Sequence, residues 1–211
     1  MKQMKYFPFI FLNISFCCLV FFQSESKGSL YGAVRKYENH TVNQQAITKL
    51  SEYDTFIRYF TNFSYFVPRH KVSPDFIRAL ILAESGANPK AISDKNALGL
   101  GQILLTTARE AGKELAKSTT TFRYVSRNTL ANLNKNDLFN PAVNILLTCY
   151  LIAKYNHKFD GKLHLVLTAW NAGENTKSLN KGRHAPYKET ENLIGKVNGY
   201  YVYLLRNKVF Q

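Results

Sequence analysis

The chain has 211 residues, of which 45% are hydrophobic and 14% are aromatic. This apolar content suffices for a packed core and excludes a fully disordered chain, and the length suits one ordinary domain with a tail or two small domains. The 28 Lys and Arg residues outnumber the 14 Asp and Glu residues and give a formal net charge of +14. Such a charge favours polyanionic partners, namely nucleic acid, an anionic membrane face or an acidic polymer.

The N-terminal residues have the layout of a secretory signal. Lys2 and Lys5 precede an uncharged apolar run from Tyr6 to Phe22, and polar residues follow up to Ser26. This order predicts a signal peptide at 1–26 and export to the periplasm or cell envelope. The run is slightly shorter than the roughly 18 apolar residues that a spanning helix usually needs. An uncleaved anchor is therefore the weaker alternative, and it is the only membrane contact that we expect.

Cysteine usage agrees with a chain that needs no disulfide framework. Cys17 and Cys18 lie in the N-terminal apolar run, so that a mature chain keeps only Cys149. A single cysteine excludes a disulfide within a mature monomer, and the chain has no CxxC metal-binding pair.

The rest of the chain is predicted to be mainly α-helical. Residues 27–45 are polar and are expected to form a linker or loosely held arm, and 46–211 are expected to form one domain. Apolar residues recur at helical spacing in 46–65, 74–85, the segment after Asn140-Pro141, 163–172 and 193–205. Ser73-Pro74 and Asn140-Pro141 are typical helix starts, while Gly86 and Gly173 are expected to end helices.

Glu84 is unusual because it continues an apolar helix face. Phe76, Leu80 and Glu84 are one turn apart and therefore share one side of the helix. A buried carboxylate is costly, so it either finds a partner or keeps its proton. A carboxylic acid that is protonated near neutral pH is what a general acid requires. The alternative is a glutamate at a helix end that faces solvent.

Two later segments indicate a ligand site, although each is weak alone. The stretch from Ser93 to Gln102 contains Gly99-x-Gly101 but lacks the third glycine and the lysine of phosphate loops, so it is better interpreted as a turn that brings backbone and Gln102 near a ligand. Residues 169–173, Ala-Trp-Asn-Ala-Gly, place an aromatic ring and an amide at a helix end, as in many sugar platforms. A core tryptophan and a capping asparagine are the plainer explanations.

Taken together in order, these motifs resemble the lytic transglycosylase domain, over roughly residues 53–205. The motifs that carry the resemblance are Glu84-Ser85-Gly86, Ser93, Ala97 to Ile103, Thr107-Ala108, Leu138 to Pro141 with Asn144-Ile145, Ala169 to Gly173, and Pro186 to Thr190. The chain departs from the family's usual residues in several places: Gly101 replaces Met, Leu105 replaces Pro, Trp170 replaces Tyr, Thr148 stands where Gly is common, and Leu193 stands where Tyr often occurs.

The resemblance implies a lysozyme-like fold of the goose-type lysozyme and lytic transglycosylase kind. It implies cleavage of the MurNAc–GlcNAc β-1,4 bond of peptidoglycan with formation of a 1,6-anhydro ring, by one acid/base, Glu84, and without a cofactor or metal. The residues that match the family's substrate-binding groove are Ser93, Gln102, Trp170, Asn171 and Glu189. Peptidoglycan glycan strands are the implied partner.

Some residue roles have competing explanations. Trp170 forms either an aromatic wall of the sugar groove or part of the core behind it. Glu189 matches a groove residue, but it also suits a helix N-terminus, where the dipole stabilises an acid. Asp94 is available as a second acidic group, although a role in forming the turn is favoured.

Other functional classes are less well supported. The chain has neither the His-Glu-x-x-His motif of zinc proteases nor the Gly-x-Ser-x-Gly motif of serine hydrolases. Basic residues are spread along the chain and an export signal disfavours nucleic acid as a partner. Two alternatives stay open: a muramidase that hydrolyses the same bond, and a non-catalytic wall-binding component of a secretion or conjugation apparatus. The biological setting, whether wall turnover, secretion, conjugation or phage entry, is open as well.

Overall fold

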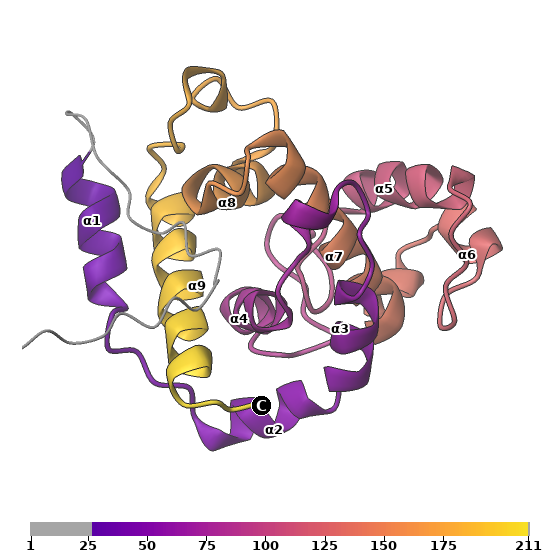
Figure 1. Ribbon diagram of the computed structural model, residues 1–211, viewed down its shortest axis with the longest axis horizontal. Helices are drawn as coiled ribbons and strands as arrows, with labels where there is room; N and C mark the ends of the chain where they lie inside the picture. Colours follow the sequence, from indigo (N-terminus) through magenta and orange to yellow (C-terminus); the bar gives the residue numbers. More distant parts are fainter. Residues whose placement is uncertain (1–26, 211) are drawn as a thin grey trace, which may run out of the picture.

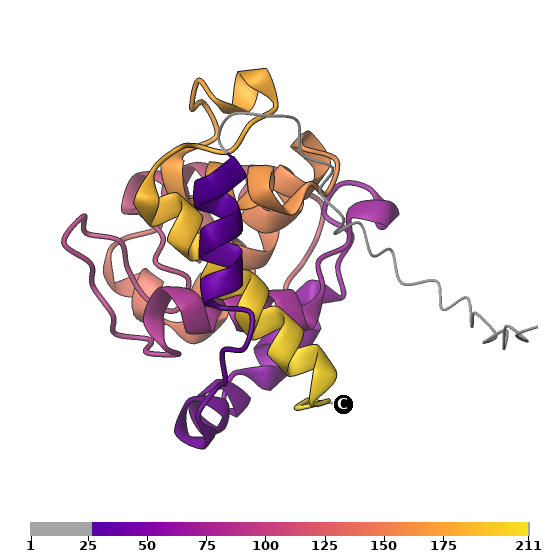
Figure 2. The same cartoon turned by 90° about the vertical axis from the view of Figure 1, so that its left-hand side faces the viewer.

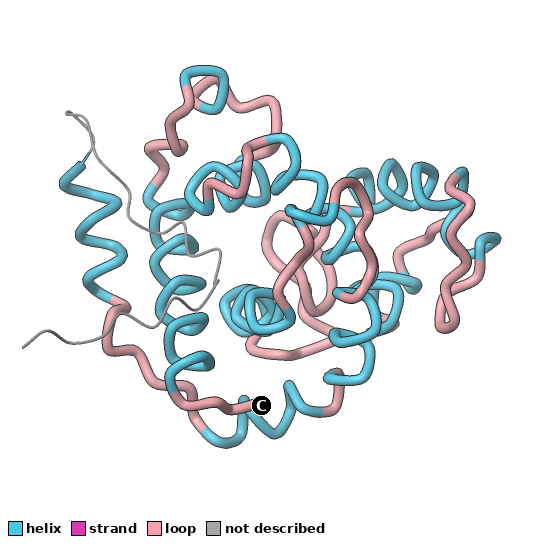
Figure 3. Tube along the Cα trace, in the orientation of Figure 1, coloured by secondary structure: helices cyan, strands magenta, loops and turns pink. Residues whose placement is uncertain are grey.

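A computed structural model describes residues 27–210, and within this range the regular structure is helical (Figures 1 and 3). The elements are α1 (Lys27–Lys36), α2 (Gln44–Ser51), α3 (Asp54–Thr61), η1 (Pro68–His70), α4 (Pro74–Ser85), α5 (Leu105–Lys117), α6 (Arg127–Ala131), η2 (Asn136–Phe139), α7 (Pro141–Lys158), α8 (Leu163–Ala172), η3 (Leu179–Lys181) and α9 (Lys188–Arg206). The only β-type pairings among the described residues are isolated bridges from Leu98 to Ile92 and to Ile103. The mainly α fold class is therefore confirmed. The predicted signal peptide at 1–26 lies outside the described residues.

Helices α4 and α7 supply much of the core. Helix α7 buries side chains around most of its circumference, and Ile145, Leu147 and Ile152 have no exposed surface. Helix α4 packs against α9, α3 and α2, and in Figure 1 it lies at the centre of the molecule. Between residues 27 and 210, no helix combines the length and the hydropathy that a membrane span requires.

Local sequence signals set several helix boundaries as predicted. Helix α4 begins at Pro74, directly after Ser73, and ends before Gly86, whose φ of 58° is left-handed. A left-handed residue at this position suits glycine because it has no Cβ. Helix α7 begins at Pro141, and the Asn140 side chain accepts a hydrogen bond from the Ala142 N–H at 2.9 Å. Helix α8 ends before Gly173, also as predicted.

The helix prediction was wrong over 46–65 and missed α5. The single helix expected over 46–65 is two short helices, α2 and α3, because the chain turns at Glu52 and Tyr53. Helix α5 was not predicted at all. It buries mainly small side chains, namely Ala108, Ala111 and Gly112, and Leu115 is its only large buried apolar residue, which is too few to reveal a helical period.

The expectation of a loosely held arm at 27–45 was also wrong. Helix α1 packs along α9, as Figure 2 shows, and buries Leu30, Ala33 and Tyr37 at this contact. Gly195 and Gly199 on α9 permit the close approach, since a Cβ added at these two positions would lie 2.5 Å from the Ala33 oxygen and 2.4 Å from the Tyr37 oxygen. The proposed domain boundaries themselves stay predictions.

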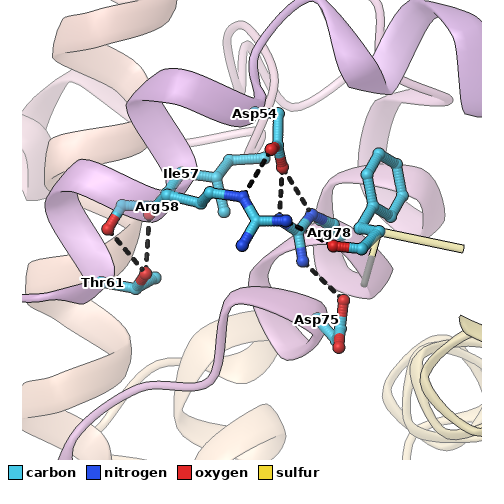
Figure 4. Close-up of polar contacts among 7 residues, drawn as sticks. Asp54, Ile57, Arg58, Thr61, Asp75 and Arg78 are labelled. Atoms are coloured by element: carbon cyan, nitrogen blue, oxygen red, sulfur yellow. Dashed lines mark hydrogen bonds and ion pairs between the residues drawn. The ribbon is translucent and has the colours of Figure 1, made fainter. Parts of the chain in front are cut away.

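A buried arginine fixes helix α4 to its neighbours (Figure 4). Arg78 is 2% exposed, and it donates hydrogen bonds to Asp54 on α3 and to Asp75 on α4. Its guanidinium also lies 4.3 Å from the centre of the Phe210 ring. Burial raises the pKa of Asp54, but hydrogen bonds from Arg58 and Arg78 outweigh it and keep that pKa below its usual value. This cluster ties α3, α4 and the C-terminal end together and so steadies the helix that carries Glu84.

Candidate active site

Glu84 lies on the last turn of α4, where the apolar face of the helix reaches a cavity. Phe76 and Leu80 on the same face are buried, and Glu84 is half-buried. Its carboxylate has found a partner: the Trp170 indole Nε1–H donates a hydrogen bond to Glu84 Oε1 at 2.7 Å. The indole comes from the end of α8, so this contact joins two helices through residues that are 86 positions apart in sequence.

The environment of Glu84 raises its pKa from 4.5 to about 7. Burial is the main cause because it disfavours the charged form, and the negative charge of Glu189 acts in the same direction. The Trp170 hydrogen bond and the positive charge of Lys196 oppose the shift without cancelling it. Glu84 is therefore able both to donate and to accept a proton near neutral pH, as an acid/base catalyst must.

The loop between α4 and α5 folds back on itself beside Glu84. The Ser93 Oγ accepts a hydrogen bond from the Ala97 N–H at 3.0 Å. Gln102 has a φ of 52°, and its side-chain amide donates to the backbone oxygens of Ala91, at 3.2 Å, and Gly99, at 2.9 Å. Ser93 and Gln102 thus shape the loop and also line the cavity. The interpretation of this segment as a turn that brings Gln102 to a site agrees with this geometry.

Asn144 on α7 anchors the same loop through hydrogen bonds to its backbone. It is fully buried, its Oδ1 accepts from the Gly101 N–H at 2.8 Å, and its Nδ2 donates to the oxygens of Leu98, at 3.0 Å, and Leu138, at 2.8 Å. One side chain therefore bonds three backbone groups, and it is the side-chain partner of the Gly101 N–H and the Leu138 oxygen, which would otherwise be costly to bury. The loop position depends directly on this residue.

The start of α9 contributes an ion pair at the edge of the cavity. Glu189 Oε2 lies 2.6 Å from Lys95 Nζ, and the Asn171 side-chain amide donates to Glu189 Oε1 at 3.4 Å. Asn171 Oδ1 in turn accepts from the Thr190 hydroxyl at 2.6 Å. The hydrogen bond from Lys95 is the main reason that the pKa of Glu189 is below its usual value, so Glu189 is ionised at neutral pH.

These groups meet in one cavity of about 230 Å³, called here the Glu84 pocket. It is lined by Glu84, Ser93, Lys95, Ala97, Gln102, Ile103, Leu104, Thr107, Leu151, Tyr155, Trp170, Asn171 and Glu189. The described residues contain no group of three or more His, Cys, Asp or Glu side chains arranged to hold a metal ion. The carboxyl, amide and ammonium groups of the pocket offer proton transfer and hydrogen bonding to a ligand.

A family comparison agrees with this geometry. The family model of the Transglycosylase SLT domain matches residues 64–194, which include helices α4 to α8 and the loop between α4 and α5. The chain belongs to the transglycosylase SLT domain family. The resemblance seen in the sequence motifs is thereby confirmed.

Known relatives of this SLT domain are much longer proteins. A curated protein of Haemophilus influenzae named "Putative soluble lytic murein transglycosylase" is 32% identical over 151 residues, which are 65% of this chain and 23% of that protein. The SLT domain chain thus spans about a quarter of the length of such relatives.

Two solved structures share the fold of this SLT domain. An inactive mutant of the lytic transglycosylase Slt from Pseudomonas aeruginosa has a TM-score of 0.54 at 22% identity, and covers 74% of this chain and 24% of its own. The 70 kDa soluble lytic transglycosylase Slt70 from Escherichia coli has a TM-score of 0.56 at 23% identity, with the same coverage of 74% and 24%. They confirm the lysozyme-like fold that the sequence led us to expect.

All six residues proposed for the SLT domain's site line the Glu84 pocket: Glu84, Ser93, Gln102, Trp170, Asn171 and Glu189. Their functional roles stay predictions. Trp170 is half-buried at the pocket wall, and Asp94 is exposed and does not line the pocket.

Sequence reasoning missed four pocket residues, Lys95, Leu104, Leu151 and Tyr155. Leu151 and Tyr155 lie one turn apart on α7, a spacing that indicates a shared face but does not show what that face contacts. For Lys95, its place two residues after Ser93 was the available signal.

Two unusual residues of this SLT domain are in contact. A Cβ added at Gly101 would lie 2.3 Å from the Thr148 Oγ1, so a side chain at 101 and the threonine at 148 exclude each other. The family usually has a large Met at 101, and Gly is common at 148. In this chain the small residue is at 101 and the larger one is at 148. We interpret the two departures as one exchange of volume across the contact between the loop and α7.

This contact predicts a compensating pair of substitutions. Gly101→Ala alone should lower the free energy of unfolding by about 1–3 kcal/mol through overpacking. Combined with Thr148→Ala, which removes the opposing hydroxyl, it should cost clearly less than the sum of the two single changes. Urea denaturation of all four proteins measures the coupling. Gly32→Ala is the matched control, because no atom lies within 4 Å of its added Cβ. If the effects of the two substitutions on the free energy of unfolding were strictly additive, the interpretation as an exchange of volume between 101 and 148 would be wrong.

The single tryptophan of the chain should report the protonation of Glu84. Because Trp170 Nε1 donates directly to Glu84, its fluorescence should change as Glu84 ionises, with a midpoint near pH 7. The Glu84→Gln variant keeps an oxygen that accepts this hydrogen bond but does not titrate, so its emission should stay constant over the same range. Identical titration curves for the two proteins would show that another group causes the change.

Proposed function

We propose that this SLT domain is a peptidoglycan lytic transglycosylase that cleaves the MurNAc–GlcNAc β-1,4 bond. The observation that carries the proposal is Glu84: a half-buried carboxyl group in a pocket, hydrogen-bonded to Trp170 and with a pKa of about 7. The names of its relatives, a soluble lytic murein transglycosylase and the transglycosylases Slt and Slt70, support it. The P. aeruginosa structure is of an inactive mutant in which a glutamine replaces a glutamate.

In the proposed mechanism, one carboxyl group handles both protons. Protonated Glu84 donates its proton to the glycosidic oxygen, and the bond to C1 of MurNAc breaks as the GlcNAc hydroxyl leaves. The C6 hydroxyl of the same MurNAc then attacks C1, and the Glu84 carboxylate accepts the proton that this hydroxyl loses. A 1,6-anhydro ring forms, Glu84 regains its proton, and no water is consumed. A pKa near 7 suits both steps, because the group must be a fair acid and then a fair base.

Glu189 is the second carboxylate of the pocket, and its contacts disfavour a role as a base. One of its oxygens is held by Lys95 and the other by Asn171, and its pKa is lowered. A hydrolytic muramidase would need a second group. This group would be either a base that activates a water molecule to attack the sugar or a nucleophile that attacks the sugar itself. Glu189 is better suited to holding substrate groups together with Asn171, while Ser93, Gln102 and Trp170 shape the pocket.

Product analysis tests the proposal. Purified sacculi are digested with the protein, and the released muropeptides are analysed by mass spectrometry. Fragments ending in 1,6-anhydroMurNAc are expected, which are lighter by one water than reducing-end products. Reducing MurNAc ends would establish the hydrolytic alternative, and no release at all would favour the non-catalytic wall-binding alternative.

The proposed substrate also bears on location. Peptidoglycan lies outside the cytoplasm, so we propose that the protein acts in the periplasm or cell envelope. The basic start and apolar run at 1–26 support export. Mass spectrometry of the protein from its native host should find a mature chain that begins near Lys27. A soluble cytoplasmic form with Met1 intact would contradict this.

A further inference from the structure

Lys95 stands at the edge of the Glu84 pocket on a tight turn. The turn is held by the Ala97 N–H, which donates to Ser93 Oγ at 3.0 Å, and by the Asn96 N–H, which donates to the Ser93 oxygen at 2.9 Å. Asn96 adopts a left-handed φ of 59° within it. The backbone at Lys95 is therefore fixed, while its side chain is 72% exposed and able to reorient.

The charge of Lys95 is distinctive among the residues that line the pocket. The pocket contains two acidic side chains, Glu84 and Glu189, and Lys95 is the one cationic residue in the set that lines it. Without Lys95, the negative charge of Glu189 would repel an anionic ligand that enters beside α9. A cation at this point makes the pocket edge acceptable to a carboxylate.

The ion pair between Lys95 and Glu189 is easily exchanged. Its Nζ–Oε2 distance is 2.6 Å, but the two side chains are 72% and 60% exposed. Exposed ion pairs contribute little to stability because water screens them and ordering long side chains costs entropy. A carboxylate on a bound ligand can therefore take the place of Glu189 at small cost.

We propose that Lys95 recognises the lactyl carboxylate of MurNAc, giving up its contact with Glu189 for one with the substrate. This inference rests on the function proposed above. MurNAc differs from GlcNAc by a lactyl ether, and in peptide-free strands this group ends in a free carboxylate. In such strands Lys95 is a specificity-determining residue, because it distinguishes MurNAc from GlcNAc. It thereby fixes the register of the glycan strand, with a MurNAc beside the turn.

Binding measurements on an inactive background test this inference. The Glu84→Gln protein is titrated by calorimetry with a peptide-free GlcNAc–MurNAc oligosaccharide and with a chitooligosaccharide of equal length, which lacks carboxylates. Adding Lys95→Gln should weaken binding of the anionic oligosaccharide about three- to fivefold at low ionic strength, as for an exposed ion pair. Binding of the neutral oligosaccharide should not change, and Lys95→Arg should retain the preference. Added salt should reduce the difference.

Controls separate this inference from the function on which it rests. Lys135→Gln removes the same charge from an exposed lysine outside the pocket and should change neither affinity. If Lys95→Gln weakens both ligands equally, or neither, the recognition of the carboxylate is refuted. The function itself fails only if wild-type protein releases no 1,6-anhydro products from sacculi. A protein that makes these products and binds each ligand as tightly after Lys95→Gln as before it would keep its function and lose this inference.

Discussion

Replacing Glu84 by glutamine should abolish cleavage of peptidoglycan while leaving the fold intact. Glutamine has nearly the same shape and keeps an oxygen for the Trp170 N–H, but it cannot transfer a proton. A loss on the order of a thousandfold or more is expected, as for other groups that act as both acid and base. Release of soluble muropeptides from sacculi measures the effect. Asp94→Asn is the matched control, because this carboxylate is exposed and outside the pocket. Near-normal turnover by Glu84→Gln would end the assignment.

The same variant should become more stable than the wild type at alkaline pH. The pKa of Glu84 is about 7 in the folded protein and 4.5 as a reference for the unfolded chain, so the folded state binds the proton more tightly. The wild type therefore loses stability as the pH rises from about 4.5 to about 7, and this loss then levels off. Glutamine does not titrate and escapes the loss. In urea denaturation, the free energy of unfolding of Glu84→Gln relative to that of the wild type should rise by up to about 3 kcal/mol between pH 4.5 and pH 8. A constant difference across this range would show that Glu84 has an ordinary pKa.

Replacing Asn144 by alanine should cause the largest loss of stability that we expect. The change removes three hydrogen bonds and leaves the Gly101 N–H and the oxygens of Leu98 and Leu138 without their side-chain partner. The Leu98 oxygen still accepts from the Ile103 N–H at 3.1 Å, so two buried groups lose their partner. Unsatisfied buried groups cost about 1–3 kcal/mol each, so the free energy of unfolding should fall by about 2–6 kcal/mol. The loop that carries Gln102 should also loosen, so activity per folded molecule should fall as well.

Urea denaturation and a muropeptide release assay measure the two effects of Asn144→Ala. Asn132→Ala is the matched control, since Asn132 is exposed and bonds only within its own turn. A change there should cost less than about 0.5 kcal/mol, as is usual for surface positions. If both alanine variants have similar stability, Asn144 does not anchor the loop.

Much of the fold was predictable because its signals are local. A proline after a capping residue and a glycine at a helix end act within a few residues, so helices α4 and α8 were found with nearly correct bounds and α7 with its correct start. Helix α5 escaped because its buried side chains are small. Helix α1 escaped for a different reason: its polar sequence has few large apolar residues, and its packing depends on two glycines more than 150 residues away.

The site was partly predictable for a similar reason. Glu84 was found because a charge on an apolar stripe has a cost that a sequence reveals. The partner of that charge was not found, because the hydrogen bond from Trp170 depends on how α8 packs beside α4. Lys95 was missed because its role depends on Glu189, which reaches it from another part of the chain.

The docking of α1 on α9 has a consequence for the order in which the chain acquires structure. The first described helix buries Leu30, Ala33 and Tyr37 against the last described helix, so this contact cannot form until residues up to about 199 have left the ribosome. Contacts between distant segments form late in folding because closing a long loop costs entropy. While the chain is being synthesised, the apolar side of α1 therefore stays uncovered until α9 has emerged.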